Sequence, residues 1–218
     1  MSLLIYGIVE GGGIDTGGID LLTGRLRTVS EGQLVAVVSE HSGPPPEPTA
    51  AALADFERTV RALMDRVPIL PAQFGSVLEA EADVRDFLRR RGEDLLARLE
   101  RVRGAVEIGL RASWRHRGAL PNERAESGTA YLRDRLELRE QARRVAHQLD
   151  PLTALALSSR RVLAPRPDLP VLDAYLVDRG RVDEFVALVE KLGGGLDDVD
   201  LVCTGPWPPY SFAEGAPA

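Results

Sequence analysis

The sequence has little of three kinds of residue that often reveal what a protein does. It has one cysteine, three histidines and only 5% aromatic residues. The single thiol, Cys203, cannot close a disulfide within the chain, which fits a reducing, cytosolic compartment. The histidines His41, His116 and His147 show no metal-ligand spacing such as HExxH. These scarcities argue against a disulfide-stapled secreted domain, and we expect no metal and no cofactor.

Long apolar runs and an excess of positive charge are also missing. No stretch approaches the roughly 20 apolar residues of a membrane span, and the start MSLLIYGIVEGGG lacks the basic region of a signal peptide. The formal net charge is −6, which counts against nucleic acid as the main partner because phosphate binding requires a basic surface. We therefore expect a soluble, cytosolic protein with no membrane span and no nucleic acid partner.

The usual signs of catalysis are absent as well. There is no G-x-S-x-G elbow, and Cys203 lies in a predicted strand, where a buried apolar role is the default. The stretch GIVEGGGIDTGG is followed neither by a helical pattern nor by G-K-[ST], which favours a hairpin loop over a phosphate cradle. Carboxylates lie among arginines, as in RDRLELRE, which is typical of a solvated helix face. The prediction is a protein that is not an enzyme.

The first half of the chain combines strand and helix patterns. Strands are predicted over 3–9 and 34–39, with a short extended piece in the connector PILPAQFGSVLEAEAD. Apolar residues three and four apart predict a helix over 53–67, entered through Thr49, and a second helix over 84–102. Ser76 with Glu79 offers a capping box for the second helix, and Gly92 marks a candidate break within it.

The second half begins with a change of period near Arg103. Residues 106–114 alternate between apolar and polar, which predicts a half-buried strand. A charged helix follows over 129–149, and its predicted inward residues are Leu132, Leu136, Val145 and Leu149. A short helix after Asp150, strands near 158–165 and over 171–177, a helix over 182–192 and a strand near 197–205 complete the chain. Residues 171–177 are apolar on both faces except at Asp173, which predicts a central strand.

The order strand, helix, strand, strand, helix, strand is that of a ferredoxin-like βαββαβ unit. We therefore predict an α+β fold with two domains. Residues 1–103 form an N-terminal α/β domain with two long helices, and residues 104–218 form a ferredoxin-like C-terminal domain with a proline-rich aromatic tail.

The tail GPWPPYSF gathers aromatic side chains in a chain that has few. Prolines hold such a segment extended, so it loses little entropy on docking, and the aromatic rings bury large areas. The candidate contact residues are Trp207, Pro208, Pro209, Tyr210 and Phe212. Two interpretations stay open: the segment is a lid that closes the C-terminal domain, or it is a contact for a partner protein.

Several stretches, in order along almost the whole chain, resemble the gas vesicle protein GvpL/GvpF family. They are LLIYGIV, LVAVVSE, VPILPAQFGSV, RGAVEIGLRASW, SGTAYL and VDLVCTGPWPPYSF. The chain departs from the family pattern at Gln73, where arginine is more frequent, and at Ser76, where threonine is more frequent.

The resemblance implies a role in making gas vesicles, which are hollow protein shells that give cells buoyancy. It implies an accessory or minor structural protein at the gas vesicle or in the cytoplasm. The expected partners are the small, very hydrophobic shell protein and other accessory proteins, reached by protein–protein contact. A small enzyme or ligand-binding protein on a ferredoxin-like scaffold remains the alternative, because that fold hosts many functions.

Overall fold

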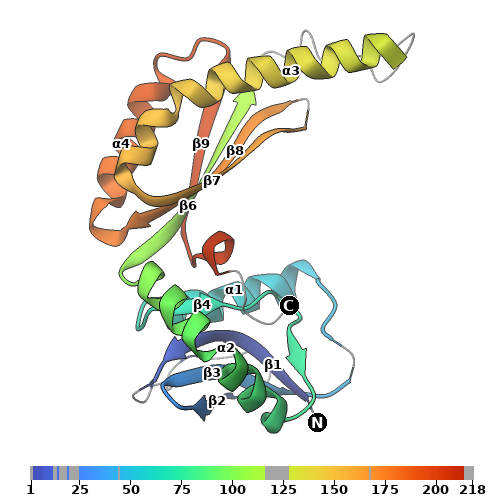
Figure 1. The fold of residues 1–218 in the computed structure, drawn as a ribbon, viewed down its shortest axis with the longest axis vertical. Coiled ribbons are helices and arrows are strands. Elements are labelled where there is room, and N and C mark those ends of the chain that lie inside the picture. The colour runs from blue at the N-terminus through green and yellow to red at the C-terminus, as the bar shows by residue number, and fades with distance from the viewer. Residues whose placement is uncertain are drawn as a thin grey trace. The chain divides into compact units, whose positions relative to one another are not determined.

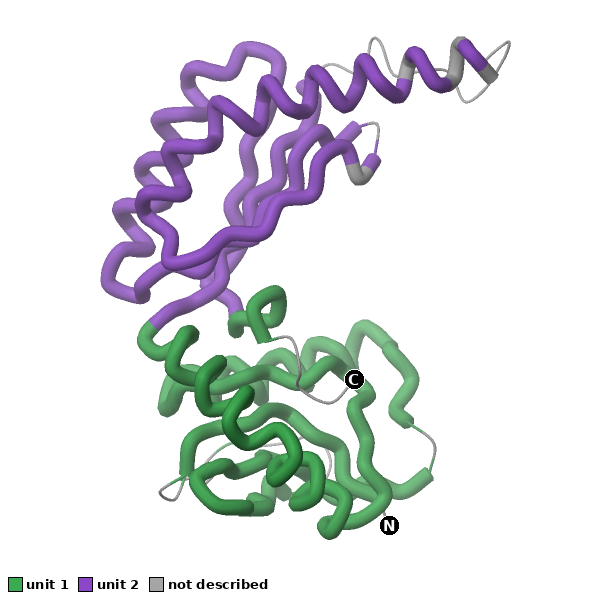
Figure 2. Tube along the Cα trace, viewed as in Figure 1, with its two compact units in different colours: residues 1–104, 208–218 green, residues 105–207 purple. Residues whose placement is uncertain are grey.

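The computed structural model describes residues 2–11, 14, 19, 25–43, 45–115, 128–166 and 168–213. The chain divides into two compact units, which we call unit 1 (residues 1–104 and 208–218) and unit 2 (residues 105–207) (Figure 1; Figure 2). Within the described residues there are two antiparallel sheets and four α-helices, which confirms the predicted mixture of α and β structure. Most of the glycine-rich loop predicted between the first strands lies outside the described residues.

Unit 1 is built on a sheet with the strand order β2-β3-β1-β4, and the short β5 also pairs with β1. The elements are β1 (Ser2–Glu10), β2 (Leu26–Glu31), β3 (Leu34–His41), α1 (Ala50–Met64), β4 (Ile69–Pro71), β5 (Val77–Leu78), α2 (Glu81–Val102) and, from the C-terminal segment, the 3₁₀ turn η3 (Tyr210–Phe212). All the pairings are antiparallel. The predicted strands over 3–9 and 34–39 are confirmed as β1 and β3. Both are buried along nearly their whole length, so both faces of the sheet are covered.

Helix α1 begins as its sequence predicts. Thr49 is the N-cap, and its Oγ1 accepts a hydrogen bond of 3.2 Å from the backbone N–H of Ala52. The stripe Phe56, Val60 and Leu63 is buried in a core cluster that also holds β1 and β3 side chains. This stripe fixes which face of α1 packs on the sheet.

Helix α2 differs from the prediction at two points. It runs without a break through Gly92, because one glycine costs a helix only about 1 kcal/mol relative to alanine and a long packed helix tolerates it. Its start is held by Asp83, whose Oδ2 accepts a hydrogen bond of 3.0 Å from the backbone N–H of Ala80. The predicted capping box at Ser76 is wrong: the Ser76 hydroxyl donates to the carbonyl oxygen of Gln73 at 2.7 Å instead.

Unit 2 has the strand order β7-β8-β6-β9, and every pairing is antiparallel. Its elements are β6 (Ala105–Trp114), α3 (Gly128–Gln148), the 3₁₀ helix η1 (Asp150–Leu155), β7 (Ala156–Arg166), β8 (Leu169–Asp178), the 3₁₀ turn η2 (Arg179–Arg181), α4 (Val182–Gly193) and β9 (Val199–Trp207). Helices α3 and α4 lie on the same face of this sheet (Figure 1). The half-buried strand predicted over 106–114 is confirmed as part of β6, since Val106, Ile108, Leu110 and Ala112 are all buried.

The inward face predicted for α3 is wrong in its first half. Val145 and Leu149 are buried as predicted, but Leu132 is 62% exposed and Leu136 is 64% exposed. The N-terminal half of α3 extends past the ends of the strands (Figure 1). At 100° per residue, moreover, both leucines lie well away from the stripe that runs through Val145 and Leu149.

Candidate functional site

The C-terminal aromatic segment belongs to both units. Trp207 is the last residue of β9 in unit 2, where it pairs with Glu107 of β6. The chain then enters unit 1, in which Pro208 and Pro209 are buried and Tyr210 and Phe212 are half-buried. The segment predicted to lie wholly in the C-terminal half is therefore divided between the two units immediately after Trp207.

Tyr210 fastens the end of the segment to helix α1. Its hydroxyl donates a hydrogen bond of 2.8 Å to Oε2 of Glu57, and its ring packs against the core cluster around Phe56. The other carboxylate oxygen of Glu57 accepts from Nε of Arg61 at 2.9 Å, which orients the acceptor. Residues 208–213 therefore cluster with unit 1, not with the C-terminal half to which the sequence analysis assigned them.

The core under this contact contains much of the aromatic content of unit 1. Tyr6 and Phe56 stack with ring centroids 5.0 Å apart, and Phe74 meets Phe56 edge-on at 5.5 Å. Burial raises the pKa of Tyr6 above its ordinary value, although a hydrogen bond with Ser39 acts in the opposite direction. These aromatic residues therefore pack in the core of unit 1, and Tyr210 packs against the same core.

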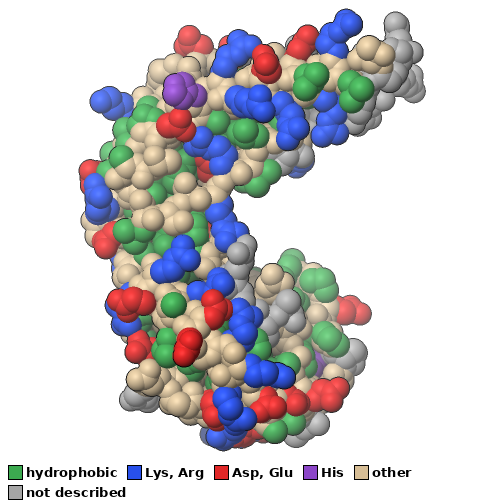
Figure 3. Space-filling view, in the orientation of Figure 1, with side chains coloured by type: hydrophobic (Ala, Val, Ile, Leu, Met, Phe, Trp, Pro, Cys, Tyr) green, Lys and Arg blue, Asp and Glu red, His purple; other side chains and the backbone are tan. Residues whose placement is uncertain are grey.

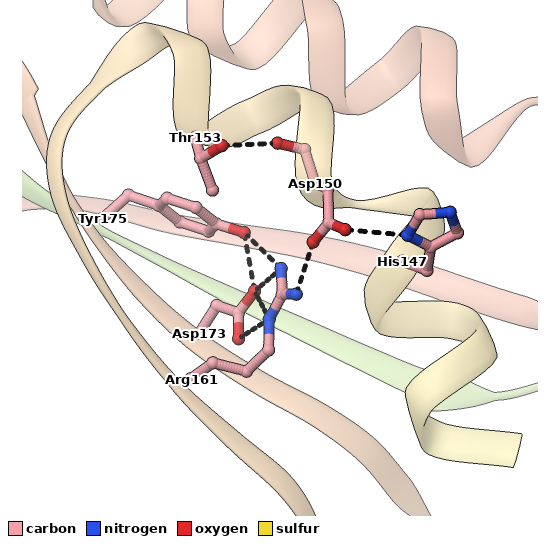
Figure 4. A network of polar contacts seen from close by, with 6 residues as sticks. All are labelled: His147, Asp150, Thr153, Arg161, Asp173 and Tyr175. Carbon is pink, nitrogen blue, oxygen red and sulfur yellow. Dashed lines mark hydrogen bonds and ion pairs between the residues drawn. The ribbon is translucent and has the colours of Figure 1, made fainter. Parts of the chain in front are cut away.

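A polar network in unit 2 joins β7, β8 and the start of η1 around the buried Asp173 and Tyr175 (Figure 4). Asp173 of β8 has a side chain only 1% exposed, and its two oxygens accept hydrogen bonds from Nε of Arg161 at 3.1 and 3.0 Å. The Tyr175 hydroxyl donates to Oδ2 of Asp173 at 2.6 Å. Neighbouring strands thus satisfy a carboxylate that would be costly to bury alone.

The network continues to the short helix that precedes β7. Nη1 of Arg161 donates to Oδ1 of Asp150 at 2.8 Å, and Nδ1 of His147 lies 2.9 Å from Oδ2 of the same residue. The Thr153 hydroxyl donates to the Asp150 carbonyl oxygen at 2.7 Å. Arg161 therefore joins β7 to both β8 and η1.

The pKa shifts of these groups reflect the hydrogen bonds that join them. Burial and then the hydrogen bond to Asp173 raise the pKa of Tyr175 still further above neutral pH. Burial opposes the charge of Arg161, but its hydrogen bonds to Asp173, Asp150 and Tyr175 outweigh this and raise its pKa. The pKa of Asp150 is lowered by Arg161 and then by His147.

Unit 2 also contains a pocket of about 540 Å³ between α3 and the loop that precedes β9. Its lining includes Trp114, Gln141 and Arg144, and across from them Asp197 and Asp198. Among the described residues that line it there is no serine, threonine, cysteine or histidine, and its charged side chains are those of Arg144, Asp197 and Asp198.

Cys203 and the arginine-rich helix faces have ordinary surroundings. Cys203 is half-buried, and its thiol pKa is raised by burial and then by the charge of Glu190, which opposes thiolate chemistry. Arg89 lies beside carboxylates of Glu31 and Asp86 at 2.9 and 2.8 Å, as expected for a solvated helix face. Acidic and basic side chains are interspersed over the visible surface (Figure 3). Within the described ranges, no group of three or more His, Cys, Asp or Glu side chains is placed to hold a metal ion.

Among the described helices, none combines the length and the apolar composition that a membrane crossing requires.

Comparisons with known proteins point to one family along the chain. The model of the family described as "Gas vesicle synthesis protein GvpL/GvpF" matches residues 2–214. Gas vesicle protein F2 of Halobacterium salinarum is 26% identical over 97% of this chain and 92% of its own. Gas vesicle protein L of a Streptomyces species is 30% identical over 75% of this chain and 69% of its own. The crystal structure of the gas vesicle protein GvpF from Anabaena sp. PCC7120 has a similar fold, with a TM-score of 0.81, 18% identity and 98% of both chains covered.

Proposed function

Because this chain belongs to the GvpL/GvpF family of gas vesicle synthesis proteins, we propose that its part in gas vesicle formation is that of a non-enzymatic assembly factor or minor structural component. It acts by contact with the small hydrophobic shell protein and with other accessory proteins, in the cytoplasm or at the vesicle. The observation that carries this proposal is the match of the family model over residues 2–214. The buried polar network supports it, because its charged groups are used in holding strands together.

The two units are proposed as the two domains of the protein, with unit 2 as a ferredoxin-like domain. In chain order its strands and α-helices run β6, α3, β7, β8, α4, β9, and the fourth strand lies beside the first. This supports the βαββαβ assignment made from the sequence. In such a domain one sheet face packs against helices, and the other face is available for contacts.

The C-terminal segment is proposed to have two roles, as an anchor and as a partner contact. Pro208, Pro209 and Tyr210 anchor it to unit 1, which the burial of the prolines and the hydrogen bond of Tyr210 to Glu57 support. Trp207 and Phe212 supply the partner contact through the parts of their rings that stay exposed, since both are half-buried. Large, stiff side chains of this kind are frequent anchors in protein interfaces.

The test is co-purification of the tagged chain with the shell protein, coexpressed with and without the other accessory proteins. A saturable complex of the two proteins alone supports direct contact, and a complex that needs the accessory proteins supports an adaptor role. No complex under any condition overturns the proposal. Trp207→Ala should weaken the complex several-fold, whereas Leu53→Ala, an exposed residue on α1, should leave it unchanged.

The pocket of about 540 Å³ in unit 2 is the observation that favours the second candidate, a ligand-binding role. A thermal-shift screen with nucleotides and divalent metals tests it. A rise in melting temperature that Arg144→Ala abolishes would favour this candidate.

A further inference from the structure

One face of the unit 2 sheet is turned away from the helices. On β8, Asp173 and Tyr175 point toward η1 and α4, since Asp173 binds Arg161 and the Tyr175 ring contacts Phe185 at 5.0 Å. Side chains alternate along a strand, so Leu172 and Ala174 project from the opposite face. We call this opposite face the open face.

Strand register places an apolar row across this face. Val162 of β7 pairs with Leu172 of β8, Leu172 pairs with Arg111 of β6, and Arg111 pairs with Val202 of β9. Directly paired residues project from the same face, so these four side chains lie side by side across all four strands. Val162 is 50% exposed, Leu172 is 38% exposed and Val202 is 49% exposed. An apolar row with this exposure, interrupted only by Arg111, marks an interaction surface more strongly than single exposed residues do.

Trp207 lies on the same face as the row. Glu107 pairs with Trp207, and Glu107 lies four residues before Arg111 on β6, about 13 Å away along the strand. Between them on this face lie Gly109 of β6 and Ala174 of β8, flanked by Thr204 of β9 and the exposed Arg160 of β7. The face therefore offers a large aromatic residue at one end, small and polar residues in the centre, and the row at the other end.

The charged side chains of this face favour an acidic partner over a basic one. Arg111 sits within the apolar row and makes no hydrogen bond or ion pair with another described residue. Of the carboxylates on this side, Asp200 is paired with Arg115 at 2.9 Å and Glu107 is buried. In a chain whose net charge is −6, this face thus favours a partner that brings a carboxylate.

We propose that this open face, formed by Val162, Leu172, Val202, Trp207 and Arg111, is the docking surface for an amphipathic helix of a partner protein. The helix presents apolar side chains to the row and a carboxylate to Arg111. A helix fits because sheet faces are buried against helices or other sheets, and the opposite face of this sheet packs against helices. The inference rests on the proposed function for the statement that the partner is a gas vesicle protein, whereas the surface itself follows from the register and exposure.

The first experiment is methyl NMR on the full chain, titrated with two synthetic amphipathic helices. One carries leucines on one side and glutamates flanking them, and the other replaces the glutamates with lysines. The glutamate helix should shift the methyl signals of Val162, Leu172 and Val202. We expect the Leu172→Glu variant to bind this helix at least tenfold more weakly than the wild type, and the Arg111→Ala variant about threefold more weakly. The matched control is Leu136→Glu, an exposed leucine on α3, which should bind as the wild type does.

Several outcomes overturn the proposal. The proposal is wrong if the methyl shifts are confined to Leu132 and Leu136, or if the two helices bind equally. It is also wrong if the signals of this face depend on protein concentration alone, which would assign the face to a second copy of the chain. The second experiment repeats the co-purification with the shell protein using Leu172→Glu and Leu136→Glu. If the wild type captures the shell protein and Leu172→Glu does so equally, the docking surface is wrong and the assembly role stands. If the glutamate helix binds the face but no vesicle protein does, the surface stands and the proposed function fails.

Discussion

Replacing Asp173 with asparagine should destabilise unit 2 by about 2–3 kcal/mol. Removing one partner of a buried ion pair costs about 3–5 kcal/mol, because the other charge stays behind without compensation. The cost is smaller here because Arg161 is 25% exposed and keeps its hydrogen bond to Asp150. An asparagine oxygen also retains one acceptor for the Tyr175 hydroxyl.

Tryptophan fluorescence during urea unfolding is the appropriate assay. Both tryptophans, Trp114 and Trp207, belong to unit 2, so the signal reports on that unit. With a urea dependence of about 1–3 kcal/mol per molar, the unfolding midpoint should fall by about 0.7–3 M. Circular dichroism checks that the variant is folded before urea is added.

Two controls isolate the buried charge as the cause. Asp150→Asn should cost about 0.5 kcal/mol or less, because the Asp150 side chain is 48% exposed and Arg161 keeps Asp173. The triple variant Arg161→Met, Asp173→Leu and Tyr175→Phe should recover most of the loss, since apolar replacements leave neither a charge nor the buried Tyr175 hydroxyl without a partner. If Asp173→Asn costs no more than Asp150→Asn, the network does not stabilise unit 2 and the reasoning is refuted.

Three further predictions concern single contacts. Tyr210→Phe should cost unit 1 about 1 kcal/mol by removing the hydrogen bond to Glu57, seen as faster amide exchange in α1, and unchanged exchange would contradict the anchor. Gly7→Ala should lower the melting temperature, with a cost of about 1–3 kcal/mol, because the new Cβ would meet a β4 side chain at 2.6 Å. Gly92→Ala, with open space around the new Cβ, should raise the stability by up to about 1 kcal/mol. Because the pKa of Asp150 lies below its ordinary value, its stabilising effect is complete above the unfolded value of about 3.9 and is lost as the pH falls through the folded value. Acid unfolding of Asp150→Asn, followed by fluorescence, should therefore depend less steeply on pH below about 4.

Local patterns predicted the elements because each element repeats its own period. The alternation in residues 106–114 and the spacing of Phe56, Val60 and Leu63 are sufficient to define a strand and a helix face. Leu132 and Leu136 were misassigned because, at 100° per residue, neither lies on the stripe of Val145 and Leu149. Where the sheet beneath a helix ends also decides which residues are buried, and that cannot be read from the period of the helix.

The candidate sites depended on contacts between distant parts of the chain. Asp173 stood out in the sequence as the one charged residue of an apolar strand, and this was a usable signal of a buried polar site. Its partner Arg161 could not be identified, because the pairing is set by the register of β7 on β8. The same applies to Tyr210 and Glu57, which are 153 residues apart in the chain.

The division of the aromatic segment after Trp207 has a consequence for how the protein is made. Unit 1 is discontinuous, because its C-terminal part follows the whole of residues 105–207 in the sequence. On the ribosome, the sheet and helices of unit 1 emerge first and must wait through the synthesis of unit 2 before Tyr210 reaches Glu57. During this interval the aromatic core of the nascent unit 1 lacks the cover that Tyr210 provides, and unit 1 is completed only after unit 2 has been synthesised.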